Sequence, residues 1–208
     1  MGSELVTHMD FLKNFVGART ELHSRKWGRM MVESVSFSPA IDGDLLIEIG
    51  EPFSAAEPLV RIHSECVFGE IFDSDLCDCA DQFHIAMKKI CAEKNGILLY
   101  LRLDGRGAGL AAKVKATALE VQGIDTYNSR KAVGVAPEGR DFRAIGKFLR
   151  DRGLQRIRLL TNNPLKRDGL RNSGLVVTRV PLLVASPSEK VRNLYHTKST
   201  MFGHQIPD

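Results

Sequence analysis

The sequence predicts an α/β (α+β) fold, with a mixed β-sheet core, flanking helices and a β-rich N-terminal part. Short strand-like stretches separated by turn signals run from about residue 26 to residue 63. From about residue 81 onward, apolar strand-like stretches alternate with stretches of helical period. A group of strands followed by alternating strands and helices indicates one mixed α/β domain. A chain of 208 residues is long enough to form such a domain.

We expect three strands in the N-terminal part. GRMMVESVSF and DLLIEIG are the first two, and the turn-forming stretch AIDGD leads into the second. The third, EPLVRIHSE, alternates residue types as a strand with one buried face does. Its inward set is Val60, Ile62 and Ser64, and its outward set is Arg61, His63 and Glu65.

Helices and strands alternate in the remainder. FHIAMKKICAEK has one apolar face, formed by Phe83, Met87, Ile90 and Cys91, and GILLYLRL follows as a buried strand. AGLAAKVKATALEVQG predicts a helix that closes at the cap residue Gly123.

DFRAIGKFLRDRGL predicts the next helix, with Phe142, Ile145 and Leu149 inward. The strand RIRLLT, a helix over about 164–173 and the strand GLVVTRVPLL complete the order.

The two ends of the chain read differently from its middle. MGSELVTHMD resembles a vector-derived leader, and the tail after Ala185 is polar, so we expect it to be irregular or only partly helical. We therefore expect a leader and N-terminal segment over 1–25, a catalytic domain over 26–185 and a C-terminal tail over 186–208.

Composition restricts the classes of partner. An apolar content of 43% and a charged content of 26% are ordinary for a soluble globular protein. No apolar run approaches the ~20 residues of a membrane span, and a secretory signal is not evident, which predicts a cytoplasmic protein. A net charge of +4 is too small to indicate nucleic acid. We expect neither nucleic-acid nor membrane partners.

Three of the four cysteines, Cys66, Cys77 and Cys79, lie close together in the chain. In a reducing compartment such spacing favours a metal or chemistry over disulfides. Cys77 and Cys79 point to the same side of an extended segment, and the intervening residues can loop back to Cys66. Three thiolates suit a catalytic zinc with one open position, and Cys91 is a candidate fourth ligand for a structural zinc. Spacing alone also leaves unmetallated cysteines open.

Basic residues gather at the ends of the downstream elements. They are Arg102, Arg106, Lys113, Lys115, Arg140, Lys166 and Arg167. The glycine-rich turn DGRGAG opens a helix and can offer N–H groups to phosphate, and TNNP starts another helix with capping residues. Each alone is typical of an ordinary solvated connection. Together with a zinc they suggest hydrolysis of a nucleotide.

Four motifs occur in order: RIHSEC followed by CDC, GILLYLRLDGRGAGL, EGRDF and RLLTNNPLK. In this arrangement the chain resembles the GTP cyclohydrolase II family from about Trp27 to Leu183. The resemblance implies an enzyme of riboflavin biosynthesis that opens the imidazole ring of GTP and releases formate and pyrophosphate. It also implies one Zn²⁺ per chain, Mg²⁺ with the triphosphate, and GTP or a related nucleotide as the partner. We expect a homodimer.

Site residues follow from the same resemblance. The zinc ligands would be Cys66, Cys77 and Cys79. The nucleotide contacts would be Arg61, Ile62, His63, Ser64, Glu65, Gln82, Asp104, Gly105, Arg106, Thr126, Thr161 and Lys166. Arg140 matches the family's nucleophile toward the α-phosphorus, and Glu138 its proton acceptor. A guanidinium stays protonated in proteins, so Arg140 could equally be a phosphate clamp.

Departures from the family pattern suggest a divergent paralogue. Thr117 stands where most members have a tyrosine, and Asp104, Gly107, Ala108 and Glu138 also differ. We expect Thr117 to point inward between Leu110, Val114 and Val121, as a core threonine or as a replacement for the phenol.

Three hypotheses follow: an authentic cyclohydrolase, a divergent enzyme that stops at the formylated product or takes another nucleotide, and a non-catalytic nucleotide-binding zinc protein. The retained ligands and basic residues speak against the third.

Overall fold

The computed structural model describes residues 16–37 and 43–206. The expected leader MGSELVTHMD lies outside these residues, and the expected segment 1–25 is described only from residue 16 onward. The mixed α/β architecture is confirmed: a seven-stranded sheet is covered by helices, and its strands run in the order β1-β2-β3-β5-β4-β6-β7.

The first half of the sheet is antiparallel and the second half is parallel. Its antiparallel strands are β1 (Arg19–Ser24), β2 (Gly28–Val35), β3 (Asp44–Ile49) and β5 (Gly96–Leu101). The strands β4 (Leu59–Ser64), β6 (Arg156–Leu160) and β7 (Val176–Val180) continue it in parallel with β5. The N-terminal part is therefore β-rich, as the sequence predicts.

Two strands differ from expectation. β1 lies before the predicted strand region, and its side chains are almost all exposed, so it carries no apolar alternation by which to find it. β4 is not a half-buried strand: it lies between β5 and β6, and residues 59–63 are buried on both faces. Arg61 and His63 are consequently only 5% and 2% exposed.

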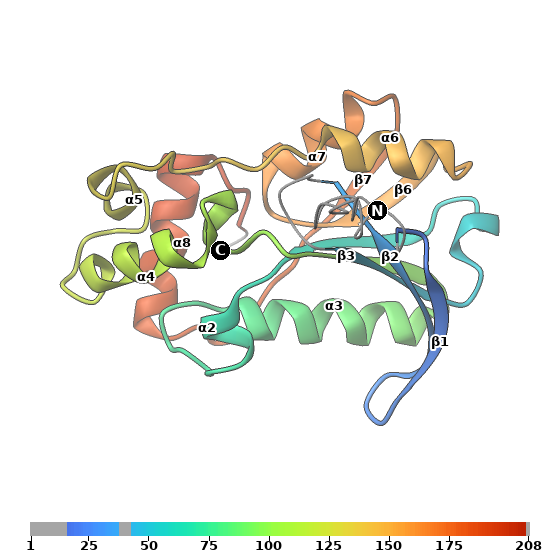
Figure 1. The fold of residues 1–208 in the computed structure, drawn as a ribbon, viewed down its shortest axis with the longest axis horizontal. Helices are drawn as coiled ribbons and strands as arrows, with labels where there is room; N and C mark the ends of the chain where they lie inside the picture. The colour runs from blue at the N-terminus through green and yellow to red at the C-terminus, as the bar shows by residue number, and fades with distance from the viewer. Residues whose placement is uncertain (1–15, 38–42, 207–208) are drawn as a thin grey trace, which may run out of the picture.

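Helices cover both faces of the sheet (Figure 1). One face packs against α3 (Cys79–Glu93), which contributes Ala86, Met87 and Ile90 to an apolar cluster. The other packs against α6 (Arg143–Asp151) and α7 (Pro164–Arg171), with Ile145 and Leu149 in the larger cluster. The predicted inward faces of α3 and α6 are thus confirmed, although Cys91 is only half-buried.

The remaining helices gather beyond one end of the sheet (Figure 1). They are α2 (Val67–Glu70), α4 (Gly109–Glu120), α5 (Asn128–Ala132) and α8 (Glu189–Phe202). The short 3₁₀ turn η2 (Asp104–Gly107) directly precedes α4, and another, η1 (Pro52–Ser54), lies between β3 and β4 in the chain. The predicted apolar face of α4 is wrong as an inward face, because Leu110, Val114 and Val121 are 45%, 52% and 71% exposed. α4 contacts η2 and α5 instead of the sheet, and it buries Lys113 and Ala116.

The tail is partly helical, which is one of the two outcomes expected for it. Residues 189–202 form the 14-residue helix α8, capped by the Ser188 hydroxyl, which accepts a hydrogen bond from the amide of Val191. Ser-x-x before a helical stretch is a capping signal, but the stretch is too polar to show a strong apolar face.

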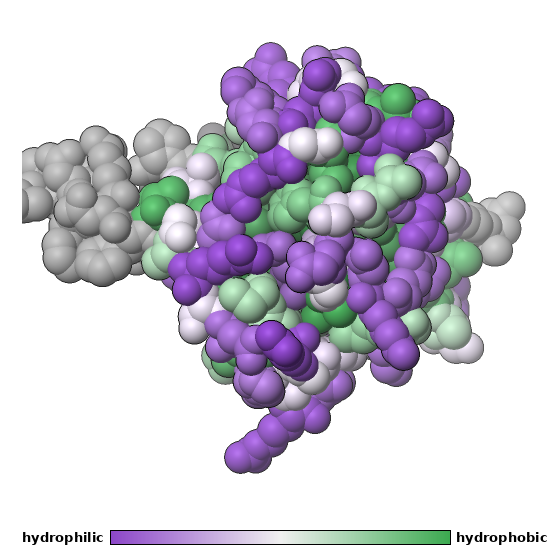
Figure 2. All heavy atoms as spheres, turned by 90° about the vertical axis from the view of Figure 1, so that its right-hand side faces the viewer, coloured by the Kyte–Doolittle hydropathy of each residue, from purple (hydrophilic) through white to green (hydrophobic). Residues whose placement is uncertain are grey.

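The opposite end of the molecule carries mainly hydrophilic side chains around scattered apolar patches (Figure 2). Among the described residues, no helix is long and apolar enough to cross a membrane.

Candidate active site

A pocket lies where the chain leaves the carboxyl ends of β4 and β5. Its wall combines residues from β4 and the turn after it, the start of α3, η2, α4, the start of α7 and the tail from α8 onward. Because β4 and β5 are parallel neighbours, the segments that follow them meet at the same edge of the sheet.

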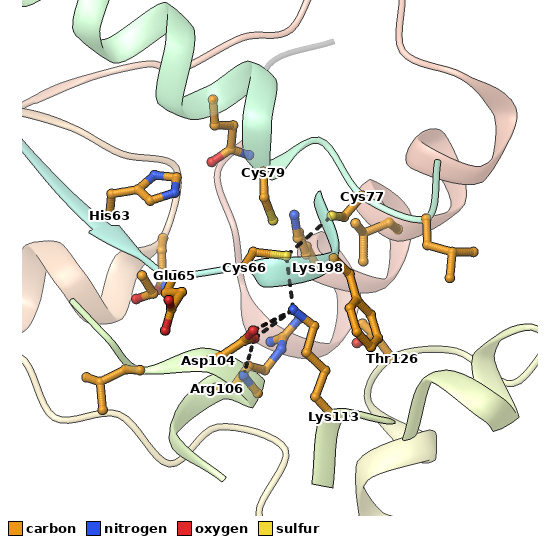
Figure 3. Close-up of a pocket in the computed structure, with 18 of the residues that line it drawn as sticks. His63, Glu65, Cys66, Cys77, Cys79, Asp104, Arg106, Lys113, Thr126 and Lys198 are labelled. Carbon is orange, nitrogen blue, oxygen red and sulfur yellow. Dashed lines mark hydrogen bonds and ion pairs between the residues drawn. The ribbon is translucent and has the colours of Figure 1, made fainter. Parts of the chain in front are cut away.

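The three clustered cysteines meet in this pocket with their sulfurs turned toward one another (Figure 3). The Sγ atoms of Cys66, Cys77 and Cys79 lie within 4.8 Å of one another, and those of Cys66 and Cys77 are 3.7 Å apart. A tetrahedral zinc with Zn–S bonds of about 2.3 Å separates its sulfurs by about 3.8 Å, so the donor set fits Zn²⁺. No fourth ligand joins them among the described residues.

Cys91 lies outside the cluster. Its Sγ is 3.7 Å from the backbone oxygen of Trp27, and it packs at the edge of the apolar cluster beneath α3. Burial raises the pKa of its thiol, which is typical of an inert structural cysteine.

The environment favours a thiolate at Cys66. Hydrogen bonds from the Cys77 and Cys79 thiols lower the pKa of Cys66, and the ammonium of Lys113 adds to the effect. The Nζ atom of Lys113 lies 3.1 Å from the Cys66 sulfur (Figure 3). A buried cation against a thiolate also offsets the net negative charge that three thiolates give a zinc site.

Gly69, in the short helix α2, packs directly against the cysteine sulfurs. A Cβ atom at this position would lie 2.8 Å from the Cys77 sulfur and 3.4 Å from the Cys66 sulfur. The three cysteines therefore surround a space that only glycine leaves open.

The carboxylate of Asp104 is fully engaged within the protein. It accepts hydrogen bonds from the amides of Val67 and Gly105, at 3.0 and 2.5 Å, and from Lys113, at 2.7 and 2.9 Å. Asp104 thus ties the turn after β5 to the residue that follows Cys66. The residue is 7% exposed, so this position supports the cysteine loop at least as directly as it borders the pocket.

Four cations of the pocket have no carboxylate at ion-pair distance within the described part of the chain. They are Arg61, Arg106, Arg130 and Lys166. Burial lowers the pKa of Arg61 and of Arg106 to about 10 each. The pKa of Lys166 falls well below its usual range, because of burial first and then repulsion by Arg61 and Arg140. A buried, mutually repelling set of cations is an environment that a polyanion relieves.

Arg140 also lines the pocket, and its guanidinium is oriented by hydrogen bonds to Glu138 and Ser64. Its guanidinium donates to the Glu138 carboxylate and, at 3.1 Å, to the hydroxyl of Ser64. Burial acts to raise the pKa of Glu138, but hydrogen bonds from Arg140 outweigh it and leave the pKa lowered. Glu138 therefore orients the Arg140 guanidinium by accepting its hydrogen bonds, and the Glu138 side chain does not line the pocket.

His63 is buried beside the cysteine loop. Its Nε2 atom lies 2.9 Å from Glu70, and its ring stacks on Tyr100 with centroids 5.8 Å apart. Burial lowers its pKa to about 4, so the ring is neutral near pH 7.

The pocket collects all but two of the residues expected at the site. Those that line it are Arg61, His63, Ser64, Glu65, Cys66, Cys77, Cys79, Gln82, Asp104, Gly105, Arg106, Thr117, Thr126, Arg140, Thr161 and Lys166. Besides Glu138, the exception is Ile62, whose side chain belongs to the core while its carbonyl oxygen accepts a hydrogen bond of 2.9 Å from Lys166. Thr117 is half-buried and faces the pocket rather than an apolar core.

Sequence reasoning missed several residues of this wall. In the sequence Lys113 is one basic residue among many, and Arg130 lies in a polar stretch of the kind that is usually exposed to solvent. Tyr195, Lys198 and His204 come from the tail and also line the pocket. The local sequence signal for these three residues is the capping serine at the start of α8. Their contact with the pocket depends on long-range packing, which no local pattern predicts.

Comparison with known proteins identifies the family of the chain. The family model described as GTP cyclohydrolase II matches residues 17–181. The chain is 45% identical over 156 residues to the riboflavin biosynthesis protein RibBA of Bacillus velezensis, which covers 74% of this chain and 39% of that protein. It is 43% identical over 167 residues to RibBA of Bacillus cereus strain G9842, covering 80% of this chain and 40% of that protein.

The chain therefore spans about two fifths of the length of these relatives. Among solved structures, RibBX of A. baumannii, a two-domain 3,4-dihydroxy-2-butanone 4-phosphate synthase, matches 83% of this chain and 44% of its own, with a TM-score of 0.38 and 16% identity. The family match over most of the chain and the identity to RibBA show that the chain belongs to the GTP cyclohydrolase II family of enzymes.

Proposed function

We propose that this chain catalyses the zinc-dependent hydrolytic opening of the imidazole ring of GTP, with release of pyrophosphate. The observation that carries the proposal is the juxtaposition, in one pocket, of three converging thiols and four cations. Three of these cations are buried, and none of the four has a carboxylate partner among the described residues. Three sulfurs leave a metal one open position, and the cations match a triphosphate. Family membership supplies the class of reaction.

Cys66, Cys77 and Cys79 would hold the zinc, with Lys113 and Gly69 shaping the site around them. When bound, Zn²⁺ supplies a Lewis acid that activates water near neutral pH for attack on the purine ring. The neutral His63 and the carboxylate of Glu65 lie nearby on the same strand and its continuation, where groups that accept or donate a proton are needed.

The triphosphate would lie against Arg106, Arg130, Lys166 and Arg140. A guanidinium binds phosphate oxygens with two parallel hydrogen bonds, and an ammonium acts as a point charge. Arg140 is already oriented by Glu138 and Ser64, which suits a clamp on the α-phosphate as pyrophosphate leaves. We propose that Mg²⁺ accompanies the triphosphate, as it does in most nucleotide enzymes.

A second candidate outcome rests on Thr117. This side chain faces the pocket one helical turn after Lys113, where a tyrosine would extend several ångströms further. We propose that ring opening proceeds while the second hydrolysis is slow, so that a formylated pyrimidinone accumulates. Losing one positioned hydrogen-bond or proton-transfer group typically costs about 10²–10⁴ in rate.

The test is to incubate the chain with GTP and Mg²⁺ and to measure pyrophosphate, formate and the ring-opened product. The proposal predicts ring opening of GTP that Cys77→Ser abolishes, and pyrophosphate release that depends on Arg140. A formate-to-pyrophosphate ratio well below one supports the stalled product, and Thr117→Tyr should raise the ratio. A ratio near one contradicts the stalled product alone. Absence of pyrophosphate and ring opening contradicts the function.

The homodimer and the cytoplasmic location stay predictions. For the homodimer, the exposed apolar residues of α4 offer a surface that a second copy could cover. Size-exclusion chromatography with light scattering tests it.

A further inference from the structure

Helix α8 crosses the pocket from its cysteine side to its cation side. Near its start, Lys190 pairs with Asp75 in the loop that leads to Cys77, at 2.5 Å. After its end, the amide of Gln205 donates to the backbone oxygen of Asn162 at 2.9 Å. Between these points, the guanidinium of Arg106 lies over the ring of Phe202, with Cζ 4.1 Å from the ring centroid.

The contact of α8 that bears on chemistry is with Asp78, the residue between Cys77 and Cys79. The Asp78 side chain is 1% exposed and lies away from the open pocket. One of its oxygens accepts from Tyr195 at 2.5 Å, and the other lies 3.3 Å from the Lys198 ammonium. A carboxylate buried this deeply requires such partners, because an unpaired buried charge is very costly.

Asp78 is also connected, through Gln82, to Arg61 on the cation side of the pocket. The amide nitrogen of Gln82 donates to Asp78 at 2.7 Å, and the amide oxygen of Gln82 accepts from Arg61 at 3.0 Å. The donor to Asp78 fixes which way the Gln82 amide faces, so its oxygen is presented to Arg61. One carboxylate thereby links α8, the two cysteines beside it in the chain and, through Gln82, the pocket cation Arg61.

We propose that helix α8 supports the metal centre through two positioning residues, Tyr195 and Lys198. They hold the carboxylate of Asp78 in place and thereby fix the positions of the Cys77 and Cys79 sulfurs. The inference rests on the proposed zinc site. Metal sites tolerate deviations of only about 0.2 Å in their ligand distances, and removing an outer partner typically costs 10–100-fold in metal affinity. If Asp78 loses its donors, it is free to turn, and the two adjacent cysteines move with it.

The alternative is that α8 merely covers the pocket. Tyr195→Phe separates the two readings, because it keeps the ring and its packing and removes only the hydroxyl donor. Lys198→Met removes the charge and keeps most of the side-chain length. Lys190→Met is the matched control: it removes a lysine–aspartate pair from the same helix, but one whose side chains are 58% and 68% exposed.

The experiment measures zinc affinity of the full chain by competition with a chromophoric chelator, without GTP. A second readout is the thiolate-to-metal charge-transfer spectrum of the Co²⁺-substituted protein. We expect Tyr195→Phe and Lys198→Met to weaken zinc binding by about 10-fold or more and to shift the Co²⁺ spectrum. Lys190→Met should leave both unchanged.

Zinc affinity and Co²⁺ spectra like those of the unmodified chain in Tyr195→Phe would overturn the inference. Should Lys198→Met fail to fold, Tyr195→Phe decides alone. A chain that binds zinc in this Tyr195-dependent way but does not open GTP refutes the proposed function and leaves the inference standing. A chain that takes up no zinc refutes both the inference and the metal part of that function.

Discussion

Replacing Gly69 by alanine adds one methyl group in the middle of the cysteine cluster. The new Cβ atom would lie 2.8 Å from the Cys77 sulfur, 3.2 Å from the Cys79 Cβ and 3.4 Å from the Cys66 sulfur. Gly69 has no positive φ and lies in helix α2, so its backbone suits alanine. The substitution therefore tests the space around the sulfurs, with little strain in the backbone.

The structure gives the size of the effect. Ordinary contacts begin near 3.4 Å, so the Cys77 sulfur must retreat by about 0.6 Å, three times the deviation of about 0.2 Å that metal–ligand distances tolerate. We expect zinc affinity to fall by at least 10-fold, the lower end of the range for disturbed surroundings of metal ligands. Without zinc, the apoprotein should lose at most about 1–3 kcal/mol from overpacking, offset in part by the roughly 0.5–1 kcal/mol by which alanine favours a helix over glycine.

The assay is chelator competition together with thermal unfolding, each with and without zinc. Gly139→Ala is the control, since Gly139 is another glycine without positive φ, and its added Cβ would meet only the Arg106 backbone oxygen, at 3.3 Å. Unchanged zinc affinity in a folded Gly69→Ala protein would refute the reasoning, because the sulfurs would then not surround this space when metal is bound.

Three further predictions follow from the site. Cys91→Ser should retain about one zinc per chain in metal analysis; loss of zinc would contradict the three-ligand arrangement. Arg140→Ala should suppress pyrophosphate release at least 10-fold while the protein stays folded, and a normal rate would remove Arg140 from the mechanism.

For His63, the folded pKa of about 4 lies below the unfolded value of ~6.5, so the unfolded chain binds the proton more readily. Stability should therefore fall as the pH drops from about 6.5 to 4, by roughly 3 kcal/mol from this group. Denaturant unfolding should show a flatter pH profile over that range in His63→Gln; identical profiles would count against the buried neutral ring.

The sequence carries enough information for the sheet and the cysteine cluster, for different physical reasons. Strands such as β5 are continuous apolar runs, and α6 repeats its apolar residues at helical spacing, so both can be found locally. Cys77 and Cys79 are close in the chain, and a short loop returns to Cys66. Resemblance to the family then predicts Arg61, Arg106, Arg140 and Lys166 as site residues, which spacing alone does not bring together, and it does not predict Arg130.

What the sequence does not reveal depends on long-range packing. β4 appears half-buried because its charged residues alternate, yet Arg61 faces the pocket inside the protein. Apolar residues on α4 suggest an inward face, whereas the helix instead buries Lys113 against Asp104. Tyr195 meets Asp78 across 117 positions of the chain, and no local pattern marks such a pair.

The most direct test of the account is a zinc titration of activity. Apoprotein prepared with a chelator is given GTP, Mg²⁺ and increasing zinc, and ring opening is followed together with pyrophosphate. The account predicts no ring opening without zinc and a linear rise that saturates at one zinc per chain, with Cys77→Ser inactive throughout. Full ring opening of GTP by metal-free protein, or saturation that is unaffected by Cys77→Ser, would contradict it.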